Sequence, residues 1–474
     1  MHTPVTAVTA ALAAALSFTL PAHAAKDADL AEIRAQVKQM KEAYEQRITA
    51  LESRLAEAEK TAVKAETTAA KVEAGAIQSA AAAAPMPAAT TSASAFNPAI
   101  YAVLQGVYAN LSQDPNKYVI NGFVPSGDIA PAKRGFSIAE SELGFSANVD
   151  DKIYANLILA LSPDNSVEVE EAYGVLTALP GGLRPKFGRF LSSIGYLNDQ
   201  HQHGWDFYDA PLPYQAFFGG QFRSDGLQMK WVAPTDTYLE LGAEVGDGAS
   251  FPGTERNRNG VGNYALYAHA GGDIGANHSW RAGLSYLGLK PQDREYVQVD
   301  TSGVDSQLAF SGRSQLAIAD FVWKYAPNGN AQSTNFKLQG EYFWRKESGD
   351  LTYDRDGALG LTNDSSYSSR QSGWYLQGVY QFLPEWRVGV RYDQLEPGSP
   401  DYGSNATYLD SSGFNPKRYA AMVDYTTSEF GRFRLQVQQS KLLPDLTDNQ
   451  VFLQYVLTLG AHCSQILRKL KGIT

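Results

Sequence analysis

Hydrophobic and polar side chains alternate with a period of two over residues 97–462. The clearest segments are 237–246, 335–347 and 386–393. In the first of these, Leu241 and Val245 share one face while Glu244 lies on the other. A period of two is that of a β-strand, and charged residues on the second face need water. We therefore expect a sheet with an apolar outer face and a second face that lines an aqueous lumen.

The connections between these strands alternate between short turns and long polar stretches. The short turns lie at 150–152, 180–182, 234–236, 275–277, 327–330, 383–385 and 428–431, and the long stretches at 111–135, 196–220, 247–262, 289–311, 347–369 and 394–413. Short periplasmic turns and long extracellular loops are typical of outer-membrane barrels. The count is about 16 strands, which returns both ends to the periplasm. The predicted fold is an all-β transmembrane antiparallel β-barrel wide enough for an aqueous channel.

The residues before the strands show other patterns. Residues 1–24 carry an apolar run and an Ala-His-Ala ending, which predict a signal peptide, with an N-terminal membrane anchor as the alternative. In 25–65 apolar residues recur at spacings of three and four, which predicts a self-associating periplasmic α-helical coiled coil. A lone surface helix would show the same stripe. Residues 66–96 are rich in Ala, Ser, Thr and Pro and form a linker.

Two segments do not fit a regular barrel. Glu168, Glu170 and Glu171 cannot all face the lumen of a regular strand, so we predict a β-bulge there or a register other than the one assigned. The tail 463–474 follows the last expected strand, where barrels of this type usually end near an aromatic residue. It is therefore an atypical C-terminal tail.

Composition narrows the classes of protein that remain. The chain has 42 Gly, 26 Tyr and 21 Phe, which fit the dense turns and aromatic girdles of such a barrel. No stretch reaches the 18 apolar residues of a transmembrane helix. A net charge of −10 argues against a nucleic-acid partner. The sequence contains neither the G-x-S-x-G motif nor the H-E-x-x-H motif, so we do not expect an enzyme.

Four short motifs carry a family resemblance. They are EAY at 171–173, KFGRF at 186–190, LQGEYF at 338–343 and RVGVRYD at 387–393. Together they resemble the phosphate- and polyphosphate-selective porin O/P family over most of the barrel. The resemblance implies a homotrimeric channel in outer-membrane lipid that passes small polar solutes or ions, with the third extracellular loop folded inward as a constriction. The chain also resembles proteobacterial proteins labelled zinc-regulated outer-membrane receptors. A receptor or transporter for a metal, and a non-transporting adhesin or structural tether, remain alternatives.

The third extracellular loop, 196–220, departs from an anion-selective pattern because it has no Lys or Arg. The residues predicted at the constriction are Asp199, His201, His203, Asp206 and Asp209. Such a loop would favour cations or neutral solutes over phosphate. His201, His203 and Asp199 have donor types and a spacing that suit Zn²⁺, the only cofactor suggested. Loop histidines also serve as hydrogen-bonded packing groups, and that alternative stays open.

The inward faces of the predicted strands carry charges of both signs. The residues predicted to line the pore include Lys230, Arg281, Lys337, Glu341, Arg345, Arg387, Arg391, Asp393, Asp424 and Arg434. They are either cross-strand pairs that keep a wet wall folded or the source of a transverse field that orients solutes. Both can hold at once.

Overall fold

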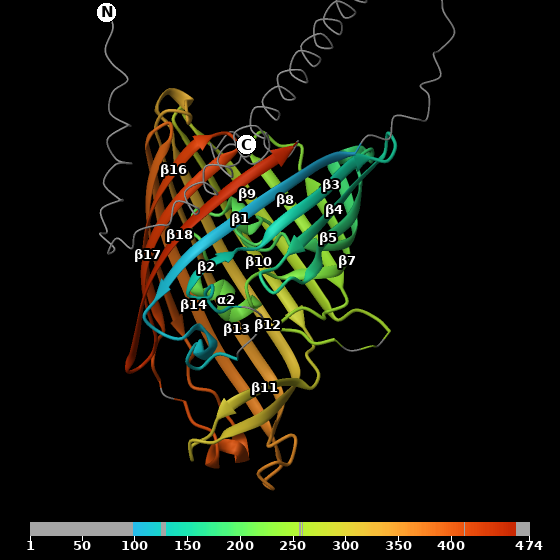
Figure 1. Cartoon of the computed structure of the whole chain (residues 1–474). Coiled ribbons are helices and arrows are strands. Elements are labelled where there is room, and N and C mark those ends of the chain that lie inside the picture. Colours follow the sequence, from blue (N-terminus) through green and yellow to red (C-terminus); the bar gives the residue numbers. More distant parts are fainter. Residues whose placement is uncertain (1–97, 125–128, 256, 258, 412, 461–474) are drawn as a thin grey trace, which may run out of the picture. The chain divides into compact units, whose positions relative to one another are not determined.

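The strands pair antiparallel into one closed sheet. The computed structural model describes residues 98–124, 129–255, 257, 259–411 and 413–460. Closure is direct, because β1 pairs with β18 from Tyr101 opposite Gly460 onward. β2 and β3 share one place in the wall beside β1, and β10 and β11 share another beside β12. The wall therefore has sixteen strands, which confirms the predicted barrel (Figure 1).

The bounds of the elements are as follows. The strands are β1 Ala99–Leu111, β2 Gly135–Ile138, β3 Ser141–Asn148, β4 Ile153–Leu161, β5 Val167–Leu176, β6 Leu183–Leu191, β7 Arg223–Val232, β8 Tyr238–Gly246, β9 Asn263–Ile274, β10 His278–Leu289, β11 Arg294–Val299, β12 Asp305–Tyr325, β13 Asn335–Tyr353, β14 Asn363–Leu383, β15 Trp386–Glu396, β16 Lys417–Ser428, β17 Gly431–Leu443 and β18 Leu446–Gly460. The helices are η1 Pro115–Lys117, η2 Pro180–Gly182, η3 Gln202–Gly204, α2 Leu212–Phe218, η4 Pro327–Gly329 and η5 Gly403–Thr407. Within the described residues, no helix has the length and apolarity needed to cross a membrane.

The wall is apolar outside and polar inside, the reverse of a soluble protein. On β17, Phe433 and Leu435 are 47% and 48% exposed, whereas Arg434 and Gln436 between and beside them are 1% and 0% exposed. Successive side chains of a strand point to opposite faces, so the pattern of the sequence maps directly onto the two faces of the wall. An outer face of this kind is suited to a bilayer.

The two ends of the barrel differ. The short turns and both chain ends of the barrel lie at the top of Figure 1, and the long loops lie at the bottom. Two of the predicted long loops, 289–311 and 347–369, were wrong. β11 and β12 occupy most of 289–311, β13 and β14 occupy most of 347–369, and only 354–362 connects β13 to β14. The outer part of β14 has polar residues on both faces, so the sequence there lacks the alternation that marks a wall strand.

The bulge predicted among the glutamates of β5 is confirmed. Ile158 of β4 pairs with Glu171 and the next residue, Leu159, pairs with Val169. Glu170 is therefore the extra residue of a β-bulge. Because of the bulge, both Glu170 and Glu171 are buried on the lumen side.

The predicted signal peptide at 1–24, the coiled coil at 25–65, the linker at 66–96 and the tail at 463–474 lie outside the described residues. These four assignments stay predictions.

Candidate functional site

The chain between β6 and β7, residues 192–222, folds into the barrel and is named here the inner loop. Figure 1 shows its helix α2 within the ring of strands. Asn198 closes the neck of the loop. Its Nδ2 donates to the carbonyl oxygens of Ser192 and Phe222 at 2.7 Å each, and its Oδ1 accepts from the N–H of Phe222 at 2.8 Å. The loop is thus a closed unit with a fixed base.

Helix α2 is the apolar anchor of the inner loop. All seven of its residues are buried. Phe217 stacks on Phe343 of β13 with ring centroids 5.8 Å apart, and Tyr214 packs edge-on against the same ring at 5.1 Å. The helix ends at Gly219, whose φ of 67° is a left-handed conformation that glycine adopts without strain. Burial of large side chains, at about 1.5–3 kcal/mol each, fixes the helix against the wall.

Two wall carboxylates hold the backbone of the inner loop. Glu341 on β13 accepts from the N–H groups of Tyr196 and Leu197 at 2.9 and 3.1 Å. It also accepts from the hydroxyl of Tyr214 at 2.9 Å. Glu244 on β8 accepts from a backbone N–H near the start of the loop at 3.0 Å. These hydrogen bonds to β13 and β8 hold the loop on two sides of the barrel.

Asp209 of the inner loop is ion-paired with the wall. Its carboxylate lies 2.9 Å from Arg391 of β15 and 2.5 Å from Arg418 of β16. Gln436 of β17 donates to the same carboxylate at 2.9 Å. Burial opposes the charge, but Arg391 and Arg418 lower the pKa of Asp209 to about 2. The negative charge is present at neutral pH and is compensated by its partners.

Asp206 is compensated in the same way. It pairs with Lys337 of β13 and lies 3.3 Å from Arg387 of β15. Burial again opposes the charge, and Lys337 and Arg387 lower the pKa of Asp206. The sequence suggested that Asp199, Asp206 and Asp209 give the loop a net negative field. The structure pairs the last two with cations, so the wall offsets much of that field.

Arginines of β17 bind carbonyl oxygens of the inner loop. Arg432 Nη2 donates to the carbonyl of His203 at 2.7 Å, and Arg434 Nη2 donates to that of Trp205 at 2.9 Å. Arg434 also pairs with Asp424 of β16 at 2.7 Å. Arg434 therefore both pairs with a neighbouring strand and positions the inner loop.

The ten residues predicted to line the pore all belong to inward faces. Those that contact the inner loop are Arg281, Lys337, Glu341, Arg345, Arg387, Arg391, Asp393 and Arg434. Asp424 pairs with Arg387 and Arg434 across the wall, and Lys230 lines a cavity. The residues Asn198 and Tyr214 were missed by sequence reasoning, because no local pattern distinguishes a loop-closing amide or a buried hydroxyl.

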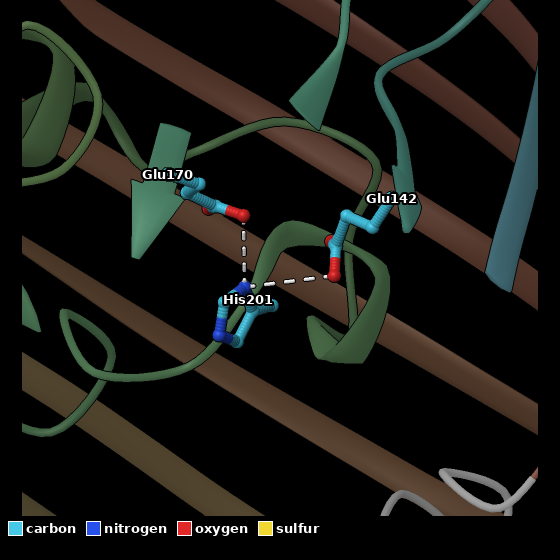
Figure 2. A group of neighbouring side chains, drawn as sticks. All are labelled: Glu142, Glu170 and His201. Atoms are coloured by element: carbon cyan, nitrogen blue, oxygen red, sulfur yellow. Dashed lines mark hydrogen bonds and ion pairs between the residues drawn. The ribbon is translucent and has the colours of Figure 1, made fainter. Parts of the chain in front are cut away.

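His201 lies among three wall carboxylates, two of which Figure 2 shows. Its Nδ1 is 3.1 Å from Glu170 Oε2 and 3.7 Å from Glu142 Oε2. Its Nε2 is 3.1 Å from Glu171 Oε2. The ring of His203 stacks beside it, with Nδ1 2.6 Å from Glu142 Oε1. Burial alone would lower the pKa of His201, but Glu170 and Glu142 raise it well above its ordinary value.

The structure regroups the residues suggested as metal ligands. The ligand atoms of Glu142, Glu170 and His201 all lie within 4.8 Å of one another, and Asp199 is exposed and outside this group. His203 contacts Glu142 from the side. The sequence shows the excess of charge at Glu170, but it gives no sign that Glu142 or Glu170 lies beside His201. They lie on other strands, and barrel closure brings them to the loop.

Cavities lie on both sides of the inner loop. One of about 520 Å³ opens toward the long loops, and its charged lining is Glu140, Asp164, Glu168, Glu170, Asp209, Arg223 and Arg418. Another of about 590 Å³ lies toward the short turns, and its charged lining is Asp199, Lys230, Glu240, Asp273, Arg281, Lys324 and Lys337. The first is mainly acidic and the second has four cations with three anions. The lumen is therefore polar on both sides of the loop, with a different balance of charge on each.

Comparison with known proteins gives one relative in sequence and several barrels in structure. The chain is 30% identical over 357 residues to an uncharacterised protein of Aquifex aeolicus, and the match covers 70% of each chain. No family model matches, so the resemblance to porin O/P rests on the four motifs alone. Similar solved structures include an OmpT variant of Vibrio cholerae that lacks loop L8 (TM-score 0.48, 12% identity, 77% of this chain and 99% of that chain) and the outer membrane channel DcaP of Acinetobacter baumannii (0.48, 13%, 77% and 97%). An anion-selective porin from Comamonas acidovorans has a TM-score of 0.46 at 10% identity, covering 77% of this chain and 99% of that chain. At these scores the likenesses assign no function.

Proposed function

The chain belongs to the same family as the Aquifex aeolicus protein, and we propose that it is an outer-membrane porin, a passive channel for small hydrophilic solutes or ions. The inner loop is its constriction. The main support is that this loop is bound to the lumen wall through Glu341, Asp206 and Asp209. Polar cavities lie on either side of it. Charged groups around a narrowing decide which solutes enter, so we expect selection among solutes to occur at the inner loop.

The outer surface supports a position in the outer membrane. Trp386 and Tyr425 pack together near the short turns with ring centroids 4.7 Å apart, and Tyr392 and Tyr419 do so further along the same strands at 4.8 Å. Between them Val390 is 64% exposed. Aromatic residues at both edges of an apolar band are the signature of a barrel that crosses a bilayer.

The width of the barrel favours a porin over an energy-coupled receptor. A receptor of that kind encloses a plug within roughly 22 strands, whereas this wall has sixteen. The inner loop is a connection between two wall strands, β6 and β7, and not a separate plug domain. Hydrogen bonds and ion pairs hold it inside the barrel. We further propose a homotrimer of the porin O/P type, which the predicted coiled coil at 25–65 would support through the periplasm.

Planar-bilayer recording tests the channel and the constriction together. We expect stable conductance steps from the refolded full chain, appearing in threes if the protein is a trimer. Replacement of 200–217 with a short Gly-Ser linker should raise single-channel conductance by roughly two-fold or more, because it removes the segment that narrows the lumen. The matched control is the same linker in the outer loop at 399–411, which should change conductance little.

Two results would count against this function. The first is the absence of any conductance from protein that is shown to be folded by its mobility on unheated gels. A receptor or a structural tether would then be the remaining function. Equal conductance in the parent and the loop-shortened variant would remove the inner loop as the constriction while leaving the channel in place.

A further inference from the structure

Three possible metal ligands converge beside the inner loop. Glu142 comes from β3, Glu170 from β5 and His201 from the loop itself (Figure 2). The carboxylate oxygens of Glu170 and Glu142 lie 3.1 and 3.7 Å from Nδ1 of His201. Two ligands of one tetrahedral Zn²⁺, each about 2.1 Å from the ion, stand about 3.4 Å apart. The spacing of these atoms is therefore close to that of a metal-binding set.

The second ring nitrogen of His201 has the partner that a metal-bound histidine needs. Nε2 lies 3.1 Å from Oε2 of Glu171, and Oε1 of Glu171 accepts from the N–H of Leu191 at 2.9 Å. A carboxylate on the far nitrogen orients the ring and turns the lone pair of the other nitrogen toward the metal. Nδ1 of His203 lies 2.6 Å from Oε1 of Glu142 and so fixes that carboxylate through the oxygen that does not face His201. Both an imidazole and a carboxylate ligand are thus fixed from behind.

One buried carboxylate oxygen of the group lacks a hydrogen-bond donor among the described residues. Oε2 of Glu142 accepts no hydrogen bond from any described residue, although Glu142 is only 1% exposed. A buried carboxylate oxygen without a donor is costly, and a bound cation would satisfy it. Attachment of the loop alone would need one carboxylate beside His201, whereas Glu142, Glu170 and Glu171 surround it.

The β-bulge in β5 serves this arrangement. A regular strand would turn Glu170 and Glu171 to opposite faces, so only one of them could reach His201. The bulge turns both inward, one toward Nδ1 and one toward Nε2. Glu170 also lines the cavity of about 520 Å³ on the long-loop side, which gives an ion a path to the group.

From these contacts we propose that the barrel binds one divalent transition-metal ion, of the Zn²⁺ or Mn²⁺ class, through His201, Glu142 and Glu170. Two carboxylates and one imidazole suit such ions, and the two negative charges balance the ion. Glu171 and His203 are positioning residues behind the ligands. The site is a property of the wall and the loop, and it does not depend on what passes through the channel.

Zn²⁺ binding by the tag-free, refolded full chain in detergent tests the proposal. After removal of metals with a chelator, calorimetry should show one Zn²⁺ per chain. Glu142→Gln and Glu170→Gln should each weaken binding roughly ten-fold or more, and Glu171→Gln by about 10–100-fold through loss of the ring's support. The matched control is Glu240→Gln, since this wall carboxylate also lies 3.1 Å from a histidine, His269, and its loss should leave Zn²⁺ affinity unchanged.

The outcomes separate this site from the channel. No Zn²⁺ bound by the parent, or equal affinity in Glu170→Gln and Glu240→Gln, overturns the site and leaves the channel proposal untouched, because no membrane is involved. If the variants fail to fold, X-ray absorption of the Zn²⁺-loaded parent still decides. One imidazole with oxygen ligands supports the site, whereas two imidazoles or none overturn it.

Discussion

Asp209 shows how single charged residues hold the inner loop. Its carboxylate pairs with Arg391 and Arg418, so Asp209→Asn removes the anion that pairs with buried Arg418 and leaves Arg391 with Asp393 alone. Breaking a buried pair from one side costs about 3–5 kcal/mol. We expect a lower unfolding temperature, read from gel mobility, and a noisier single-channel current. Asp225→Asn is the control, because its ion pair with Arg189 is exposed and such pairs contribute about 0–1 kcal/mol. Equal behaviour of the two variants would show that Asp209 does not hold the loop.

The same residue sets part of the response to acid. The two arginines lower the pKa of Asp209 to about 2, from an ordinary value of about 3.9. A lowered pKa in the folded state adds stability that is fully present above the ordinary pKa and is lost as pH falls toward the folded value. The difference in unfolding temperature between parent and Asp209→Asn should therefore be constant from pH 7 to about 5 and shrink between about pH 4 and 2. A difference that shrinks already between pH 7 and 5 would contradict the assignment.

Lys324 offers a separate test of the lumen charge. It faces Lys337 directly across β12 and β13, and among the described residues it has no ion-pair partner. Like charges opposite each other cost roughly 0.2–1 kcal/mol, so Lys324→Gln should leave the barrel as stable as the parent or slightly more so. Because Lys324 lines the short-turn cavity, the reversal potential in a salt gradient should move toward cation selectivity. Lys152→Gln, in an exposed short turn, should leave that potential unchanged. No shift in Lys324→Gln would place this residue off the ion path.

Strands of the wall could be predicted wherever lipid lies on one side and water on the other. The rule failed at the outer part of β14, 363–372, where both faces are polar, yet its pairing with β13 continues. The candidate site was predicted only in part. His201 is apparent in the sequence as a loop histidine, but its contacts with Glu142 and Glu170 depend on how the barrel closes. Pairing between a loop and a distant wall strand leaves no local signal.

The bulge in β5 can be tested by deleting its extra residue and measuring whether the barrel still folds. Glu170 is the extra residue, so deleting it should restore regular pairing with β4 and keep the other side chains on their faces. We expect a folded barrel that has lost high-affinity Zn²⁺ binding. Deletion of Ala243 from the regular strand β8 is the control, because a one-residue slip turns the side chains beyond it to the wrong face. Folding is read from gel mobility before and after heating. Equal loss of folding in both deletions would mean that the bulge is needed for the barrel itself.

The orientation of the whole barrel follows from its two unlike ends. Short turns and both ends of the barrel chain lie together, and the long loops and the extensions of β12–β14 lie opposite (Figure 1). In outer-membrane barrels the short turns face the periplasm, so the acidic cavity and the His201 cluster should open to the outside. After Cys463→Ser, single cysteines at Asn259 or Ala358 should react with an impermeant maleimide on intact cells.

Cysteines at Asp151 or Asp236, in exposed short turns, should react only after the outer membrane is opened. All four positions are exposed, so a difference in labelling reports the side of the membrane and not burial. Labelling of Asp151→Cys and Asp236→Cys on intact cells, with Asn259→Cys and Ala358→Cys protected, would reverse the barrel. The acidic cavity would then face the periplasm, and an ion from outside would meet the cations Lys230, Arg281 and Lys324 before reaching the inner loop.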